Sequence, residues 1–93
     1  MVEGKTKSGF NYKYDERILN DYGLLEAIGD FDASSQKIEQ VTALKRIIDY
    51  LLGDNREAFL EHIAKQNDGF RPLDVMQAEI LEIINSSQQV KNS

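Results

Sequence analysis

The sequence contains no cysteine, no tryptophan, one histidine and one proline. Without cysteine the chain forms neither disulfides nor thiolate–metal sites, which is typical of a protein in a reducing, intracellular environment. No apolar run approaches the roughly 18 residues that a membrane-spanning helix needs. The N-terminal segment MVEGKTKSGF also lacks the apolar centre of a signal peptide. We therefore expect neither secretion nor contact with a membrane.

Residues suited to catalysis or metal binding are scarce. His62 is the only histidine, and a helix position at or near the surface explains it better than a role as a base or ligand. The acidic pairs Asp15/Glu16 and Asp30/Asp32 lack the alternating ligands, the glycine and the terminal glutamate of a calcium loop. Dinucleotide-binding, phosphate-loop and nucleophile-elbow patterns are missing as well. The sequence predicts no enzyme, no metal site and no cofactor.

The charge is acidic and unevenly distributed, with a formal net charge of −5. Residues 1–14 carry three lysines against one glutamate, whereas residues 15–32 have only Arg17 to oppose their acidic side chains. Because an acidic body repels phosphate, we do not expect nucleic-acid binding. The acidic surface either keeps the protein in solution or meets a basic partner. The acidic residues of this dense stretch are Asp15, Glu16, Asp21, Glu26, Asp30 and Asp32.

One segment has the alternation of a β-strand. Aromatic residues occupy Phe10, Tyr12 and Tyr14 with polar residues between them, the period of a half-buried strand. No other segment has a matching pattern. An unpaired strand exposes backbone donors and acceptors that favour pairing with another copy or another extended chain. Alternatively, the segment lies over the helices as an arm and covers the core with Phe10 and Tyr12.

A short helix is predicted after the aromatic segment. It is expected to begin near Asn20 or Asp21, either of which is a good N-cap, and to end at Gly29. Gly23 inside it costs about 1 kcal/mol relative to alanine, so this helix depends on packing. Its apolar, inward residues are Leu24, Leu25 and Ile28.

Three further helices are predicted by apolar residues that recur at steps of three or four. The second helix is capped by Ser34 or Ser35 and ends at Gly53, the third follows this corner, and the fourth begins at Pro72. The expected core residues are Ile38, Val41, Leu44, Ile47, Ile48, Leu51 and Leu52 in the second helix, Phe59, Leu60 and Ile63 in the third, and Leu73, Met76, Ile80, Ile83 and Ile84 in the fourth.

These patterns predict an all-α fold, a small bundle of about four helices with an N-terminal extended arm or short strand. We divide the chain into a flexible N-terminal tail (1–8), a single helical domain (9–86) and a polar C-terminal tail (87–93). The corner at Gly53 also loosely fits a helix-turn-helix, but the helix that would face DNA, NREAFLEHIAKQ, contains as many acidic as basic residues. A small helical regulatory or DNA-associated protein of a phage or mobile element is therefore the alternative function.

The order of elements resembles a known family. The run SGFNYKYDERILNDYGLLEAI, a helix ending in LLGD before a second helix, and DGFRPLDVMQAEILEII followed by a polar tail are similar to the tail assembly chaperones of long-tailed siphophages, in the short form encoded upstream of the tape measure gene. The similarity extends over about residues 8 to 90. Each of these patterns lacks a chemical signature, so their order and spacing carry the inference.

The resemblance implies a mostly helical, self-associating protein that acts in the host cytoplasm and is absent from the mature virion. Such chaperones coat the tape measure protein and recruit the tail tube protein. In the family, ribosomal slippage near the end of the reading frame yields a frameshifted longer isoform. Val90, Lys91 and Asn92 are compatible with the codons GUA AAA AAC, which contain a slippery heptamer. The candidate protein-interaction residues are Phe10, Tyr12, Tyr14, Leu24 and Leu25.

Overall fold

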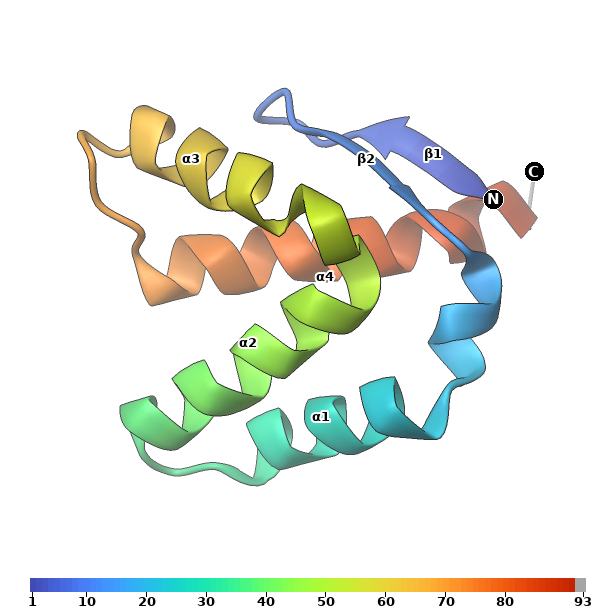
Figure 1. The fold of residues 1–93 in the computed structure, drawn as a ribbon, viewed down its shortest axis with the longest axis horizontal. Helices are drawn as coiled ribbons and strands as arrows, with labels where there is room; N and C mark the ends of the chain where they lie inside the picture. The colour runs from blue at the N-terminus through green and yellow to red at the C-terminus, as the bar shows by residue number, and fades with distance from the viewer. Residues whose placement is uncertain (92–93) are drawn as a thin grey trace.

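The computed structural model describes residues 1–91 and shows a mostly helical protein with a short two-stranded sheet at the N-terminus (Figure 1). In Figure 1 the last helix runs through the middle of the molecule, with the sheet and α3 above it and α1 and α2 below. The elements are β1 (Val2–Lys5), β2 (Asn11–Tyr14), the 3-10 helix η1 (Glu16–Asn20), α1 (Tyr22–Ala33), α2 (Lys37–Leu52), the 3-10 turn η2 (Gly53–Asn55), α3 (Arg56–Gln66) and α4 (Leu73–Lys91).

The prediction of a helical protein is confirmed, but the helices are less separate than expected. No loop separates α2 from α3, because η2 continues the helical chain between them. Gly53 makes this bend with a φ of +52°, a left-handed value that glycine adopts at little cost. Apart from the 3-10 helix η1, residues 1–91 contain three uninterrupted helical segments, namely α1, α2 with η2 and α3, and α4, where the sequence predicted about four separate helices.

The N-terminal residues correct the sequence-based prediction most clearly. Residues 2–5, expected to lie in a flexible tail, form β1 and pair antiparallel with β2, so the aromatic segment is not a lone strand. Val2 lies opposite Tyr14 and is buried. This strand has no clear alternation in the sequence because Val2 is the one large apolar residue in it. The fold is thus not purely α-helical.

The loop of this hairpin is closed by hydrogen bonds around Thr6. The Thr6 amide donates to the Phe10 carbonyl at 2.9 Å, and the Thr6 hydroxyl accepts from the Phe10 amide at 3.0 Å. Gly9, whose φ is +101°, donates to the Thr6 carbonyl at 2.9 Å. This conformation favours glycine, and Thr6 is itself almost fully buried. The loop is therefore a defined turn that fixes the register of the two strands.

Gly4 is required where β1 faces the ring of Tyr12. A methyl group at residue 4 would lie 2.7 Å from Tyr12 Cζ, and the ring is buried and has little room to move. We expect Gly4→Ala to lower the free energy of unfolding by about 1–3 kcal/mol through overpacking. Gly29→Ala is the matched control, because it meets nothing within 4 Å and should stabilise its helix by about 0.5–1 kcal/mol. Urea denaturation of both variants tests this, and a Gly4→Ala protein as stable as the parent would contradict it.

Helix α1 is longer than predicted, ending at Ala33 instead of Gly29. Asp21 caps it, accepting a hydrogen bond from the Gly23 amide at 2.9 Å. The ring of Tyr50 from α2 occupies the space where a side chain at residue 23 would lie. Gly23 is therefore explained by the close approach of α1 and α2, and packing between these helices compensates for its low helix propensity.

The hydrophobic core lies between the hairpin and the helices. The largest fully buried side chains are those of Leu24 in α1, Phe59 and Ile63 in α3, and Ile83 in α4. Most of the predicted core residues are buried, but Ile38 and Val41 at the start of α2 are exposed. The apolar stripe of α2 therefore continues beyond the core onto the surface, because nothing in the described part of the chain covers its first turns.

Helix α4 continues into the segment predicted as a polar tail. Its backbone is helical to Lys91, so most of residues 87–93 extend the helix, and residues 92–93 lie outside the described part of the chain. Over residues 1–91, no helix is both long enough and apolar enough to span a bilayer.

Candidate protein-interaction surface

The aromatic segment that the sequence marked as an interaction site faces the core. Phe10, Tyr12 and Tyr14 are 5%, 8% and 2% exposed. Phe10 meets Phe59 edge to face, with ring centroids 5.2 Å apart, and the Tyr14 hydroxyl donates to the Ile83 carbonyl at 3.0 Å. These side chains join the hairpin to α3 and α4. Of the two interpretations left open by the sequence, the aromatic side chains therefore fit a cover over the core.

The two leucines predicted alongside them have different environments. Leu24 is fully buried, whereas Leu25 is 47% exposed on the outer face of α1. Leu25 was also expected to point inward, and the helical turn instead carries it around to the surface. The structure therefore does not gather the five candidate residues into one surface, and Leu25 alone among them is substantially accessible.

A polar cluster that sequence analysis missed holds the tip of the hairpin. The Ser8 hydroxyl donates to Glu79 Oε1 at 2.9 Å and lies 2.9 Å from His62 Nε2, while the Lys7 amide donates to Glu82 at 2.9 Å. Because the Ser8 proton is used toward Glu79, His62 is placed to donate to Ser8, not to accept its proton. The cluster therefore fastens the hairpin to α3 and α4. Residues so far apart in sequence gave no local signal for it.

Glu79 is the least satisfied member of this cluster. It is 8% exposed, and its Oε2 atom has no hydrogen-bond partner among the described residues. A buried carboxylate with one free oxygen carries a desolvation cost that a single hydroxyl does not fully offset. The hairpin tip is thus less firmly held than the aromatic part of the hairpin.

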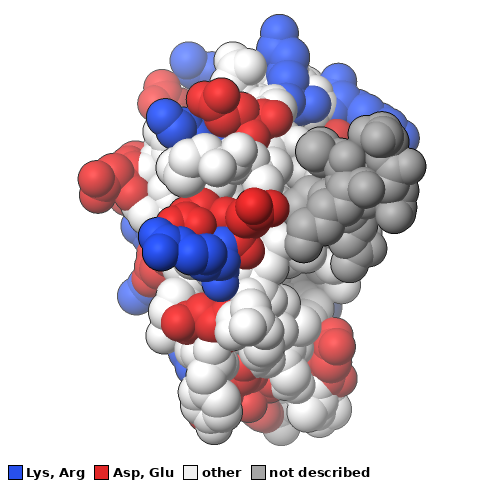
Figure 2. Space-filling view, turned by 90° about the vertical axis from the view of Figure 1, so that its right-hand side faces the viewer, with Lys and Arg blue, Asp and Glu red and all other residues white. Residues whose placement is uncertain are grey.

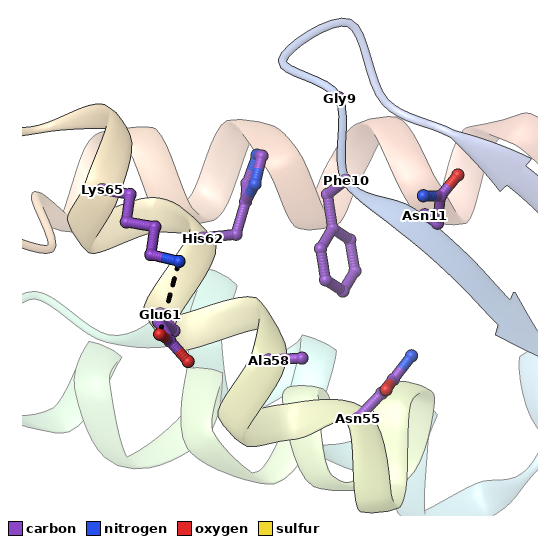
Figure 3. Close-up of a pocket in the computed structure, with 8 residues that line it drawn as sticks. All are labelled: Gly9, Phe10, Asn11, Asn55, Ala58, Glu61, His62 and Lys65. Carbon is purple, nitrogen blue, oxygen red and sulfur yellow. Dashed lines mark ion pairs between the residues drawn. The ribbon is translucent and has the colours of Figure 1, made fainter.

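A hollow lies beside the cluster, between the hairpin and α3 (Figure 3). It encloses about 440 Å³ and is open to solvent. In Figure 3 the His62 ring points up toward the hairpin loop, and Lys65 turns back to pair with Glu61 at 3.5 Å. The Lys65 charge is therefore already neutralised, and the hollow has no unpaired charged group directed into it.

Two apolar depressions lie on the surface between helices. The first, which we call the α1–α4 cleft, is lined by side chains of α1, α2 and α4. It encloses about 170 Å³. Leu81 on its α4 side is 49% exposed, and Phe31 on its α1 side is half-buried. Its apolar lining comprises Ile28, Phe31, Leu44, Ile47, Ile80, Leu81 and Ile84.

The second depression is the α2–α3 groove, on the other side of Leu44, which lines both. It encloses about 260 Å³ between α2, α3 and the start of α4. Val41, 52% exposed, forms part of its lip. The groove is lined by the apolar residues Val41, Leu44, Ile48, Leu60, Leu73 and Met76 and by the basic residues Lys45, Arg56 and Arg71.

Two of the acidic residues of α1 form ion pairs. Arg46 of α2 binds Glu26 at 2.8 Å and Asp30 at 2.9 Å, and these hydrogen bonds raise the pKa of Arg46 further above its usual value. Nearer the hairpin, hydrogen bonds from Arg17 lower the pKa of Asp15 to about 2. Figure 2 views the side with η1 and the start of α1, where acidic side chains are interspersed with uncharged ones over the lower part. The negative charge of residues 15–32 is thus partly neutralised by Arg17 and Arg46 of the same chain.

Helix α3, the helix that the alternative interpretation would direct toward DNA, offers little positive charge. Arg56 pairs with Asp49 at 3.3 Å and with Glu57 at 2.9 Å, and Lys65 pairs with Glu61. Cations that are paired in this way attract phosphate weakly.

Among the described residues, no group of three or more histidine, aspartate or glutamate side chains is arranged to hold a metal ion. Comparisons with protein-family models, with curated proteins and with solved structures found no match to this chain.

Proposed function

We propose that this protein is a tail assembly chaperone of a siphophage, which binds the tape measure protein through the α1–α4 cleft and keeps it soluble. In this role it assists recruitment of the tail tube protein, associates with further copies of itself and with a frameshifted longer isoform, and acts in the host cytoplasm without remaining in the virion. The resemblance of the sequence to this family supports the identity of the client. The cleft supports the mode of binding.

The observation that carries the proposal is the apolar cleft with Leu81 at its margin. Exposed apolar patches formed by several neighbouring side chains often mark binding sites on soluble proteins. The cleft lies between helices, so an apolar side chain from a helical client fits between α1 and α4 as a further helix would pack. Each buried apolar side chain contributes about 1.5–3 kcal/mol, so several repeated contacts along a long client add up to stable binding.

Co-expression with the downstream tape measure protein tests this function. The tape measure protein should be largely soluble with the parent chain and largely insoluble with Leu81→Asp, because a carboxylate in the cleft would lose hydration on binding. Phe70→Asp is the matched control, since Phe70 is 72% exposed and lies outside the cleft. It should solubilise the client as the parent does.

The solubility of the client can be compared between variants only if each variant keeps the parent's helical content. Circular dichroism should show the same helical content for Leu81→Asp as for the parent, because the residue is already half exposed. If the client is equally insoluble with and without the parent chain, the chaperone function is wrong. If Leu81→Asp solubilises as well as the parent, the function stands but the cleft is not its site.

A further inference from the structure

We propose that the α2–α3 groove receives the exposed start of α1 from a second copy of this chain, so that copies join head to tail. This inference rests on the self-association contained in the proposed function and names the two surfaces that carry it. It does not involve the α1–α4 cleft.

The groove offers apolar surface beside unneutralised positive charge. Val41 and Leu73 leave apolar area open along it. Lys45 has no acidic partner among the described residues, and Arg71 donates only to the Leu60 carbonyl, at 3.2 Å. In a chain with a net charge of −5, two free cations beside an apolar groove favour an occupant that carries both apolar side chains and carboxylates.

The start of α1 has that chemistry. Tyr22 is 76% exposed and Leu25 47%, and three residues apart on a helix they share one face. Asp21 precedes them and has no ion-pair partner among the described residues, while Glu26 accepts a hydrogen bond from the Tyr22 hydroxyl at 3.2 Å with one carboxylate oxygen and pairs with Arg46 at 2.8 Å with the other. Tyrosine is enriched at protein interfaces because its ring buries a large area while its hydroxyl stays hydrated. We call these four residues the α1 knob.

The groove and the α1 knob lie on opposite sides of the molecule. In Figure 1 the start of α1 is at the lower right, whereas α2 and α4 both begin at the left. A knob that enters the groove of the next copy leaves its own groove free for another. The contact is therefore heterologous, and repetition gives a ring or an open array instead of a closed dimer. Such repetition suits a coat along an elongated client.

The charge pattern selects this arrangement over contact between two like surfaces. Two knobs would bring the Asp21 carboxylates of the two copies together, and two grooves would bring Lys45 and Arg71 of each copy together, both of which are repulsive. Knob against groove pairs opposite charges around an apolar centre. The hairpin offers no competing apolar contact, because its aromatic side chains are buried in its own core.

Two substitutions test the two surfaces separately. Val41→Glu places a carboxylate one helical turn before Lys45 and blocks the groove, and Tyr22→Arg places a cation where the knob would face Lys45 and Arg71. Each should weaken self-association by at least about tenfold, measured by sedimentation velocity over a range of concentrations. Thr42→Glu is the matched control, since it adds the same charge to the exposed neighbouring position of α2 outside the groove. It should associate as the parent does.

Mixing the two variants decides whether the contact is heterologous. Val41→Glu retains an intact knob and Tyr22→Arg an intact groove, so an equal mixture should form pairs of one copy each and nothing larger. All three variants should retain the parent's circular dichroism spectrum, because the substituted residues are exposed.

Three outcomes would overturn the inference. If both variants associate like the parent, these surfaces are not the interface, although the client-binding function is untouched. If the variants do not associate and their mixture also remains single chains, the contact is not knob to groove. If the parent itself remains a single chain at high concentration, the self-association within the proposed function is wrong together with this interface.

Discussion

Replacing Phe59 by alanine is expected to lower the free energy of unfolding by about 3–5 kcal/mol. Phe59 is fully buried at the junction of α3 with the hairpin, and its ring meets Phe10 edge to face. Truncation removes this contact and leaves a cavity that surrounding side chains fill only in part. Because small domains are stabilised by only about 5–15 kcal/mol, this one change removes a large share of the total.

Thermal and urea denaturation followed by circular dichroism measure the effect. Phe70→Ala is the matched control, because it removes the same atoms from a ring that is 72% exposed. Its effect should lie within about 0.5 kcal/mol of zero. Equal destabilisation by the two substitutions would mean that Phe59 is not the centre of the core.

Tyr14→Asp is the second change expected to have a large effect, lowering the free energy of unfolding by about 3–5 kcal/mol through an uncompensated buried charge. Tyr14 is 2% exposed, stacks on Tyr12 with ring centroids 6.1 Å apart, and bonds to the backbone of α4. Tyr14→Phe keeps the ring and loses only the hydroxyl. It should cost about 1 kcal/mol or less, since the Ile83 carbonyl also accepts from Ser86.

Asn11→Asp gives the control for the added charge, because Asn11 is exposed on the same strand. Denaturation should find it close to the parent in stability. If Tyr14→Asp were as stable as Asn11→Asp but impaired in self-association, the aromatic strand would be an interface and not part of the core. That result would restore the interpretation suggested by the sequence alone.

The helices were predictable from the sequence because their apolar residues repeat with the helical period. Leu44, Ile47, Ile48 and Leu51 of α2 are buried as that period requires. The bend at Gly53 was also predictable, since a position with positive φ after an apolar helix favours glycine. What the period could not show was how tightly the bend would join α2 to α3.

The hairpin was not predictable in the same way. A strand such as β1, with Val2 as its single large apolar residue, gains its stability from pairing and from the aromatic rings opposite it, and these are tertiary effects. Gly4 also gave no sign of the strand in the sequence, because glycine is required there by the ring of Tyr12 on the paired strand. From the sequence the aromatic strand therefore lacks a partner, although β1 lies only a few residues before it.

The burial of most of the candidate interaction residues could not be predicted for a related reason. Exposed and buried apolar residues look alike in a sequence, so Phe10, Tyr12 and Tyr14 were chosen by their pattern, and Tyr22 was not. Val41 belongs to the same apolar stripe as the core residues of α2, and only the packing shows that it lies at the lip of a groove. Accessibility decides which apolar residues serve binding, and it follows from the tertiary structure.

The proposed function requires that clients bind at the α1–α4 cleft while the aromatic hairpin covers the core. The absence of cysteine allows one thiol to be introduced at a chosen position. With an environment-sensitive dye on Leu81→Cys, addition of the tape measure protein should shift the emission to the blue as the probe leaves water, whereas the same dye on Asn11→Cys should show no shift. A shift at residue 11 with none at residue 81 would mean that clients bind at the hairpin and not at the cleft.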